Sequence, residues 1–212
     1  MKRIAAHTVT AGISLVYLFL MLAKMPSVIF ILWYTPNIIA IGTVVVLMLR
    51  NLKNKPAQVK DTPAVFCAAV ISTNFCVIIS LFGGLFPLYQ VAPVAGLQMA
   101  GALINLLSMP FYISAVLSLG RGFTVLPEAL TLQINGMYKI SRHPIYLVYV
   151  FWCVSQNLIY QTASVLVFSA LQIALFCYRA RCEEKILLDT FPAYAAYAER
   201  ISWLGPKKRI QS

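Results

Sequence analysis

Long apolar runs separated by short polar connectors dominate the chain. Six of these runs, at residues 5–23, 27–49, 64–86, 94–117, 145–160 and 162–178, approach the length of one membrane-crossing helix, which needs about 20 apolar residues. The pattern predicts an all-α, polytopic membrane bundle of about six transmembrane segments. The last two runs span only roughly 25 Å each at 1.5 Å per residue. Because they meet at Tyr160-Gln161, they predict a tight helical hairpin that barely spans the bilayer or dips into it and returns.

Composition supports a membrane protein and excludes other classes. The chain is 60% hydrophobic and 11% charged, whereas soluble domains are about 45–50% apolar and about 25% charged. The net charge of +11 lies in connectors and tail, and no basic stripe on a soluble scaffold indicates a nucleic-acid partner. The two histidines, His7 and His143, are far apart, and the five cysteines form no C-x-x-C pair. We therefore predict no metal site.

The basic residues predict the orientation. Six crossings place sixteen of the seventeen lysines and arginines on one side, with Lys24 as the exception, and the positive-inside rule makes that side cytoplasmic. Both termini are then cytoplasmic. Residues 1–118 form an N-terminal part of four helices, and residues 119–212 form a catalytic region of loop, hairpin and tail. In that tail, residues 191–203 predict a short amphipathic helix along the membrane surface, where the membrane lipids would contact it.

Ionisable residues gather at the two ends of the predicted hairpin. Arg142-His143 precedes Pro144, a residue suited to the first position of a helix, and Arg179 and Glu183-Glu184 follow the sixth run. Each cluster taken alone has a simpler explanation. Arg142-His143 would only fix the orientation of the chain in the membrane, and Arg179 with Glu183 would be a surface ion pair that adds little stability. A tight hairpin brings both clusters together, however, and ionisable groups inside membrane proteins mark functional sites. We therefore predict one site at the cytoplasmic surface.

The groups in this site suit one cofactor. A carboxylate, basic residues beside a helix start and tyrosines match the hydroxyls, amino-acid head and adenine ring of S-adenosylmethionine. The chain carries no G-x-G-x-x-G sequence and no P-loop that would indicate a soluble nucleotide site.

An ordered motif set across the hairpin resembles a known family. It consists of Thr131-Leu132, Gly136, Tyr138, Arg142-His143-Pro144-Ile145-Tyr146, Arg179, Glu183-Glu184, Phe191, Tyr194 and Tyr197. This set is similar to that of the integral-membrane isoprenylcysteine carboxyl methyltransferases, within a broader group that includes phospholipid N-methyltransferases. The resemblance covers about the last ninety residues, and the four upstream helices match in hydropathy only.

The resemblance implies the site residues and the reaction. The residues implied for S-adenosylmethionine are Thr131, Leu132, Tyr138, His143, Pro144, Ile145, Tyr146 and Glu183. Arg179, Arg142 and Glu184 form the implied catalytic set, with Arg179 facing a substrate carboxylate. The implied reaction is methyl transfer to the carboxylate of a prenylated cysteine or a similar lipid-tethered acid. Val148 and Leu130 depart from residues common in the family, and both departures bear on the substrate more than on the cofactor.

Other readings remain open from the sequence. The nucleophile could be a phospholipid amine or a small thiol; an amine would first lose a proton, to Glu184 or His143. The chain could instead be a non-catalytic membrane protein whose charged end docks a partner. A reductase with a nicotinamide cofactor has less support, because no second phosphate-binding site is present. The enzymatic readings require His143 and Glu183 to meet in one pocket.

Overall fold

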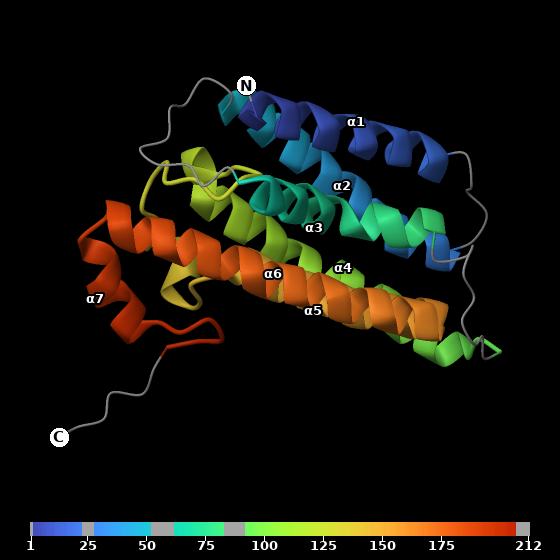
Figure 1. The fold of residues 1–212 in the computed structure, drawn as a ribbon. Helices are drawn as coiled ribbons and strands as arrows, with labels where there is room; N and C mark the ends of the chain where they lie inside the picture. The colour runs from blue at the N-terminus through green and yellow to red at the C-terminus, as the bar shows by residue number, and fades with distance from the viewer. Residues whose placement is uncertain (1, 23–27, 52–61, 83–91, 207–212) are drawn as a thin grey trace.

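The computed structural model describes residues 2–22, 28–51, 62–82 and 92–206, and every regular element in these ranges is helical (Figure 1). The elements are α1 (Lys2–Leu22), α2 (Val28–Asn51), α3 (Pro63–Phe82), α4 (Ala95–Leu119), η1 (Gly120–Gly122), η2 (Gly136–Lys139), α5 (Pro144–Tyr160), α6 (Ala163–Thr190) and α7 (Ala193–Arg200). The predicted all-α class is therefore confirmed for the described residues.

The long helices lie side by side and alternate in direction (Figure 1). As a consequence, the end of α4, the start of α5 and the end of α6 lie at the same end of the bundle, together with α7 and the loop of residues 120–143. Helix α6 packs on both α3 and α5, while α4 packs between α2 and α5. Segments more than a hundred residues apart in sequence can therefore line one pocket at that end.

Helix α6 is longer than the sequence pattern predicts. Its apolar part ends at Tyr178, as expected, but the helix continues for twelve further residues to Thr190. These residues include alanine, arginine, leucine, lysine and glutamate, which have high helix propensity. Because hydropathy detects only the part of a helix that lies in hydrocarbon, it missed the polar extension. At 28 residues, or roughly 42 Å, the complete helix exceeds the bilayer core of about 30 Å.

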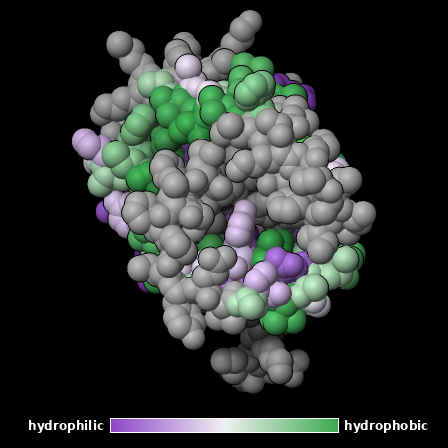
Figure 2. All heavy atoms as spheres, turned by 90° about the vertical axis from the view of Figure 1, so that its right-hand side faces the viewer, coloured by the Kyte–Doolittle hydropathy of each residue, from purple (hydrophilic) through white to green (hydrophobic). Residues whose placement is uncertain are grey.

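Two of the described helices, α4 and α6, are long and apolar enough to cross a membrane. In both, only 39% of the most apolar window is buried, and large side chains such as Leu107, Phe111 and Leu166 are exposed. Figure 2 views the end of the bundle that carries the α5–α6 turn and shows a broad hydrophobic patch beside a smaller hydrophilic group. Extensive exposed apolar surface is unusual for a soluble monomer and suits contact with lipid.

The predicted number of six crossings and the predicted orientation stay predictions. Lys24, residues 52–61 and residues 207–212, which carry much of the basic charge used to predict that orientation, lie outside the described residues. Within the described part, residues 94–120 and 143–178 contain no aspartate, glutamate, lysine or arginine.

Close packing of α4 on α5 determines the position of α5, the first helix of the hairpin. A Cβ atom added to Gly101 would lie 2.7 Å from the carbonyl oxygen of Ser155, so only glycine allows the two backbones to approach this closely. Ser155 donates to the carbonyl of Gly101 at 2.8 Å, and Trp152 Nε1 donates to Ser108 Oγ at 2.7 Å. These contacts fix α5, and therefore the residues at its first turn, relative to α4.

The α5–α6 turn is as tight as the sequence predicts. Gln161 caps α5 in the left-handed conformation with φ of 50°, and Thr162 begins the next helix by accepting a hydrogen bond from the backbone of Val165. The Gln161 side chain also accepts a hydrogen bond from the backbone N–H of Val94, next to α4. The turn is thereby attached to a third helix.

Candidate active site

The loop between α4 and α5 is attached to the bundle at two points. Asn51, the buried last residue of α2, donates from Nδ2 to the carbonyls of Gly120 and Phe123 at 3.1 and 3.0 Å. Gly136 has φ of +60°, and a Cβ atom there would lie 2.2 Å from Ser118 Oγ. A glycine is therefore required to turn the chain against α4 and to place Tyr138, as the sequence predicts.

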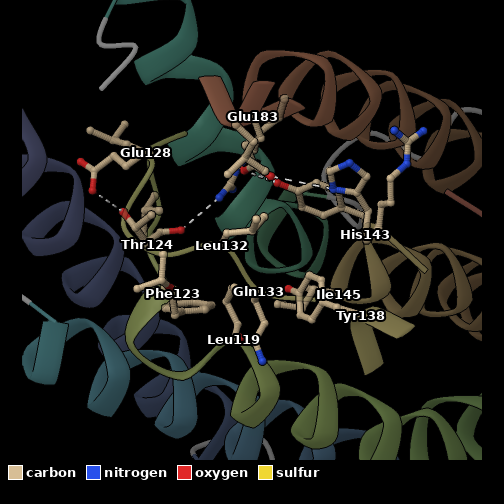
Figure 3. Close-up of a pocket in the computed structure, with 18 of the residues that line it drawn as sticks. Leu119, Phe123, Thr124, Glu128, Leu132, Gln133, Tyr138, His143, Ile145 and Glu183 are labelled. Atoms are coloured by element: carbon tan, nitrogen blue, oxygen red, sulfur yellow. Dashed lines mark hydrogen bonds and ion pairs between the residues drawn. The ribbon is translucent and has the colours of Figure 1, made fainter. Parts of the chain in front are cut away.

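A pocket opens at this end of the bundle, beneath the loop. It encloses about 940 Å³, a volume that includes its open mouth. Its polar lining comprises Thr73, Thr124, Glu128, Thr131, Gln133, Tyr138, Arg142, His143, Tyr146, Tyr149, Arg179, Glu183, Tyr194 and Tyr197. Its apolar lining includes Leu119, Phe123, Val125, Leu126, Leu132, Ile145 and Leu187. Figure 3 shows Glu128 and Thr124 on one side of the pocket and His143 on the other.

The start of α5 and the end of α6 meet in this pocket. Pro144 is the first helical residue of α5, and His143 before it is 8% exposed. His143 Nε2 lies 3.1 Å from Glu184 Oε1, and His143 Nδ1 lies 3.9 Å from Glu183 Oε2. The convergence on which the enzymatic readings depend is therefore present in the structure.

Three donors converge on one oxygen of Glu184. Arg142 Nη1 lies 3.0 Å from Oε1, His143 Nε2 lies 3.1 Å from it, and Trp203 Nε1 donates to it at 2.6 Å. Glu184 belongs to the polar extension of α6, beyond its apolar part. Partial burial alone would raise the pKa of its carboxyl, but the hydrogen bonds from His143 and Trp203 and the nearby positive charges lower it overall. Glu184 is therefore a carboxylate at neutral pH.

Arg179 is buried and bonded to three different segments. Its Nε donates to Glu183 Oε1 at 3.0 Å, its Nη1 to Thr73 Oγ1 at 2.9 Å, and its Nη2 to the carbonyl of Thr124 at 3.2 Å. The side chain is only 9% exposed. The pair that Arg179 forms with Glu183 is therefore not the surface pair that the sequence left open, because the guanidinium is buried and loss of its partner would leave a buried charge uncompensated.

Aromatic rings hold the carboxylate of Glu183 in place. Tyr146 donates to Glu183 Oε1 at 2.6 Å. Its ring stacks on His143 with centroids 5.3 Å apart and on Phe176 with centroids 5.0 Å apart. The guanidinium carbon of Arg179 lies 5.6 Å from the centroid of the same ring, within the range of a cation–π contact. Tyr146 is thus held by His143 just before α5 and by Phe176, Arg179 and Glu183 of α6.

The C-terminal segment covers one side of the site. Tyr197 in α7 donates to the carbonyl of Tyr138 at 2.6 Å, and Arg142 N donates to the carbonyl of Ser202 at 3.1 Å. Burial raises the pKa of Tyr197 to about 12 and raises the pKa values of Tyr138 and Tyr194 further above their ordinary range. All three are neutral hydroxyls that can donate hydrogen bonds at physiological pH.

Most of the residues predicted for the site line the pocket, but two do not. Pro144 is buried in the first turn of α5, and Glu184 lies behind His143 rather than at the pocket wall. The predicted residues that do line it are Thr131, Leu132, Tyr138, Arg142, His143, Ile145, Tyr146, Arg179 and Glu183.

Several residues of the site were not predicted. Thr73 lies within an apolar run, and nothing in its sequence context marks it. Glu128, in contrast, is one of only six acidic residues and is flanked by apolar residues, a signal that could have placed it in the site. Trp203 was predicted only as the end of an amphipathic segment.

The residues present fit an anionic ligand group. The Nε atom of Arg142 is buried and has no hydrogen-bond partner among the described residues, although the side chain lines the pocket. An unsatisfied buried donor on a charged group is costly, and a carboxylate such as that of a bound amino acid would satisfy it. Glu183, which also lines the pocket, offers acceptors for hydroxyl or amino groups.

Comparison with known proteins supports the motif assignment. No curated protein matches the chain. A family model does match residues 101–189, which contain most of α4, all of α5 and nearly all of α6, together with the loop that lines the pocket. It is the model of the isoprenylcysteine carboxyl methyltransferase (ICMT) family, so the resemblance inferred from the motifs is confirmed for this segment.

Proposed function

We propose that this protein is a membrane methyltransferase that uses S-adenosylmethionine and methylates the carboxylate of a prenylated cysteine or a similar lipid-tethered acid. The observation that supports this most directly is the position of His143 between Glu183 and Glu184, in a pocket whose loop and hairpin lie within the family match. Residues 144–178 contain no aspartate, glutamate, lysine, arginine or histidine, and the charged residues that flank this apolar hairpin meet at this one place.

In this proposal the cofactor is held by the wall formed by residues 131–146 and by Glu183. Bound S-adenosylmethionine would supply a methyl group already activated by its sulfonium. The free Nε–H of Arg142 would bind its carboxylate, Glu183 would accept hydrogen bonds from its hydroxyl or amino groups, and Tyr138 and Tyr146 would contact the rest. Thr131, Leu132 and Ile145 complete this wall, while Pro144 acts by starting α5.

Arg179 is suited to hold a carboxylate acceptor. A guanidinium has five N–H donors, and three are bonded to Glu183, Thr73 and the Thr124 carbonyl. These bonds to described residues use one N–H of Nη1 and one of Nη2, and the second N–H of each would bind the acceptor carboxylate. A carboxylate is already ionised at neutral pH, so the protein needs only to position it and to exclude water with apolar residues such as Leu119 and Phe123.

A specific observation also favours an amine acceptor as the second candidate. His143 lines the pocket and has the Glu184 carboxylate behind it, with Nε2 and Oε1 separated by 3.1 Å. A neutral imidazole that donates its Nε2–H to Glu184 has a lone pair on Nδ1 and can accept a proton from an amine. A carboxylate acceptor does not need this base, whereas a phospholipid amine does.

One set of measurements separates these functions. Titration calorimetry of the purified protein in detergent should show that it binds S-adenosylmethionine; no measurable affinity would overturn the proposal and favour a docking protein. Transfer of a tritiated methyl group should then be assayed with a prenylcysteine analogue, a small thiol and phosphatidylethanolamine. Radioactivity that base releases from the prenylcysteine product identifies a methyl ester, and base-stable incorporation into the lipid identifies N-methylation.

A further inference from the structure

The segment after α7 reaches back to the catalytic region and contacts Glu184. Trp203 Nε1 donates to Glu184 Oε1 at 2.6 Å, the shortest of the three polar contacts to that oxygen. The indole ring also lies edge-on against the imidazole of His143, with ring centroids 5.3 Å apart and an interplanar angle of 80°. Trp203 therefore touches both members of the His143–Glu184 pair, although it lies outside the pocket lining and outside the family match.

We propose that Trp203 is a positioning residue of this site. Its indole N–H holds the Glu184 carboxylate in the orientation in which Oε1 meets His143 Nε2, and its ring edge limits rotation of the imidazole. This inference rests on the proposed methyltransferase function, since it concerns the same site. It extends the site to a residue near the end of the chain.

Geometry gives Trp203 this role rather than a role in anchoring the segment. The backbone around Trp203 is attached independently: Ser141 Oγ donates to its carbonyl, Arg142 N donates to the carbonyl of Ser202, and Ser202 N donates to the carbonyl of Gly205 at 2.7 Å. None of these bonds involves the indole. The indole N–H is therefore available to orient Glu184, and its removal leaves the backbone contacts in place.

The charged and titratable groups around Glu184 come from three segments. Arg142 and His143 face it from the residues just before α5, Tyr194 and Tyr197 face it from α7, and Trp203 faces it from the segment that follows. Of these groups, only Trp203 donates a hydrogen bond without bringing a charge or a titration of its own. Trp203→Phe therefore removes a hydrogen bond from Glu184 while keeping an aromatic ring beside His143 and without removing a charged or titratable group.

The bundle supplies a matched control. Trp152 in α5 also donates from its indole Nε1, in this case to Ser108 Oγ at 2.7 Å, and it is 4% exposed. Trp152→Phe and Trp203→Phe make the same chemical change and remove one indole hydrogen bond each. Only Trp203→Phe removes a donor from Glu184.

The hydrogen bond can be measured without a ligand. The protein has three tryptophans, so a spectrum of the ¹⁵N-indole groups in detergent contains one cross-peak for each, and Trp203→Phe identifies that of Trp203. We expect this proton resonance to lie downfield, to move upfield as acid protonates Glu184, and to stay upfield at all pH values in Glu184→Gln. A Trp203 cross-peak that Glu184→Gln leaves unchanged would overturn the inference.

Activity provides the second test. Removal of one hydrogen bond to a charged group should lower kcat/KM on the order of ten-fold and move the acidic limb of the pH–rate profile to higher pH. Trp152→Phe should leave that limb in place, and Trp203→Phe should have no further effect in the Glu184→Gln background. If the wild type binds and uses S-adenosylmethionine but Trp203→Phe has the wild-type rate and profile, this inference fails alone. If the wild type itself binds none, the proposed function fails.

Discussion

Arg179 in α6 donates a hydrogen bond of 2.9 Å from Nη1 to Thr73 Oγ1 in α3. The Thr73 hydroxyl donates in turn to the carbonyl of Ala69 at 2.8 Å. Because its proton is used within α3, Thr73 presents lone pairs to the guanidinium. A residue outside the family match thus fixes the orientation of an arginine inside it.

Substitution of Thr73 tests this connection. Thr73→Val keeps the shape of the side chain but leaves one N–H of a buried guanidinium without its acceptor, which costs about 1–3 kcal/mol. We expect at least a roughly ten-fold loss of kcat/KM for methyl transfer, because Arg179 would no longer be held toward Glu183 and the acceptor. Thr73→Ser keeps the hydroxyl and should retain most of the activity. Equal losses in the two variants would show that packing, and not the hydrogen bond, matters at this position.

Glu183 should control affinity for the cofactor. Glu183→Ala is expected to weaken binding of S-adenosylmethionine by about ten-fold or more, which corresponds to roughly 1.4 kcal/mol in calorimetry. Glu183→Gln separates this effect from unfolding, because the amide oxygen can still accept from Arg179 and Tyr146 while the negative charge is lost. Asp189→Asn removes an exposed carboxylate from the same helix and serves as the control. If a folded Glu183→Gln variant bound S-adenosylmethionine as tightly as the wild type, the negative charge of Glu183 would not contribute to binding.

Gly136 should be sensitive to the smallest substitution. Gly136→Ala adds a Cβ atom 2.2 Å from Ser118 Oγ at a residue with φ of +60°, and the left-handed conformation alone costs about 1–2 kcal/mol. Thermal unfolding in detergent should show a lower midpoint. Gly96→Ala is the control, since no atom lies within 4 Å of the added carbon. Ser118→Ala should recover part of the loss by removing the clashing oxygen, and a Gly136→Ala midpoint equal to wild type would contradict the steric reasoning.

The sequence predicts the helices well because the apolar runs carry a strong signal. Each of the six runs forms a helix over its described residues, and the tight turn at Gln161 is present. The polar extension of α6 could not be predicted from hydropathy, because residues beyond Tyr178 resemble any charged cytoplasmic segment. Its charged residues were predicted to join the site, and contacts with the start of α5 and with the segment after α7 confirm that they lie together.

The predicted site follows from the rarity of charged residues, a signal that Thr73 lacks. Charged side chains are scarce in this chain, so Arg142, Arg179 and Glu183 stand out against an apolar background, and the structure brings them together. Thr73 resembles many small polar residues that only pack between helices. Its contact with Arg179 depends on the register of α3 against α6, which no local pattern encodes.

The pH dependence of stability tests the electrostatic description of Glu184. Its carboxyl has a pKa lowered from 4.5 in the folded protein, so its ionised form stabilises the fold. This contribution is fully present above pH 4.5 and is lost as the pH falls through the lowered folded value. The thermal midpoint of the ligand-free wild type in detergent should therefore exceed that of Glu184→Gln at neutral pH, and the difference should shrink in acid below pH 4.5. A difference that stays constant across this range would mean that Glu184 contributes through its shape rather than its charge, because only the charge titrates.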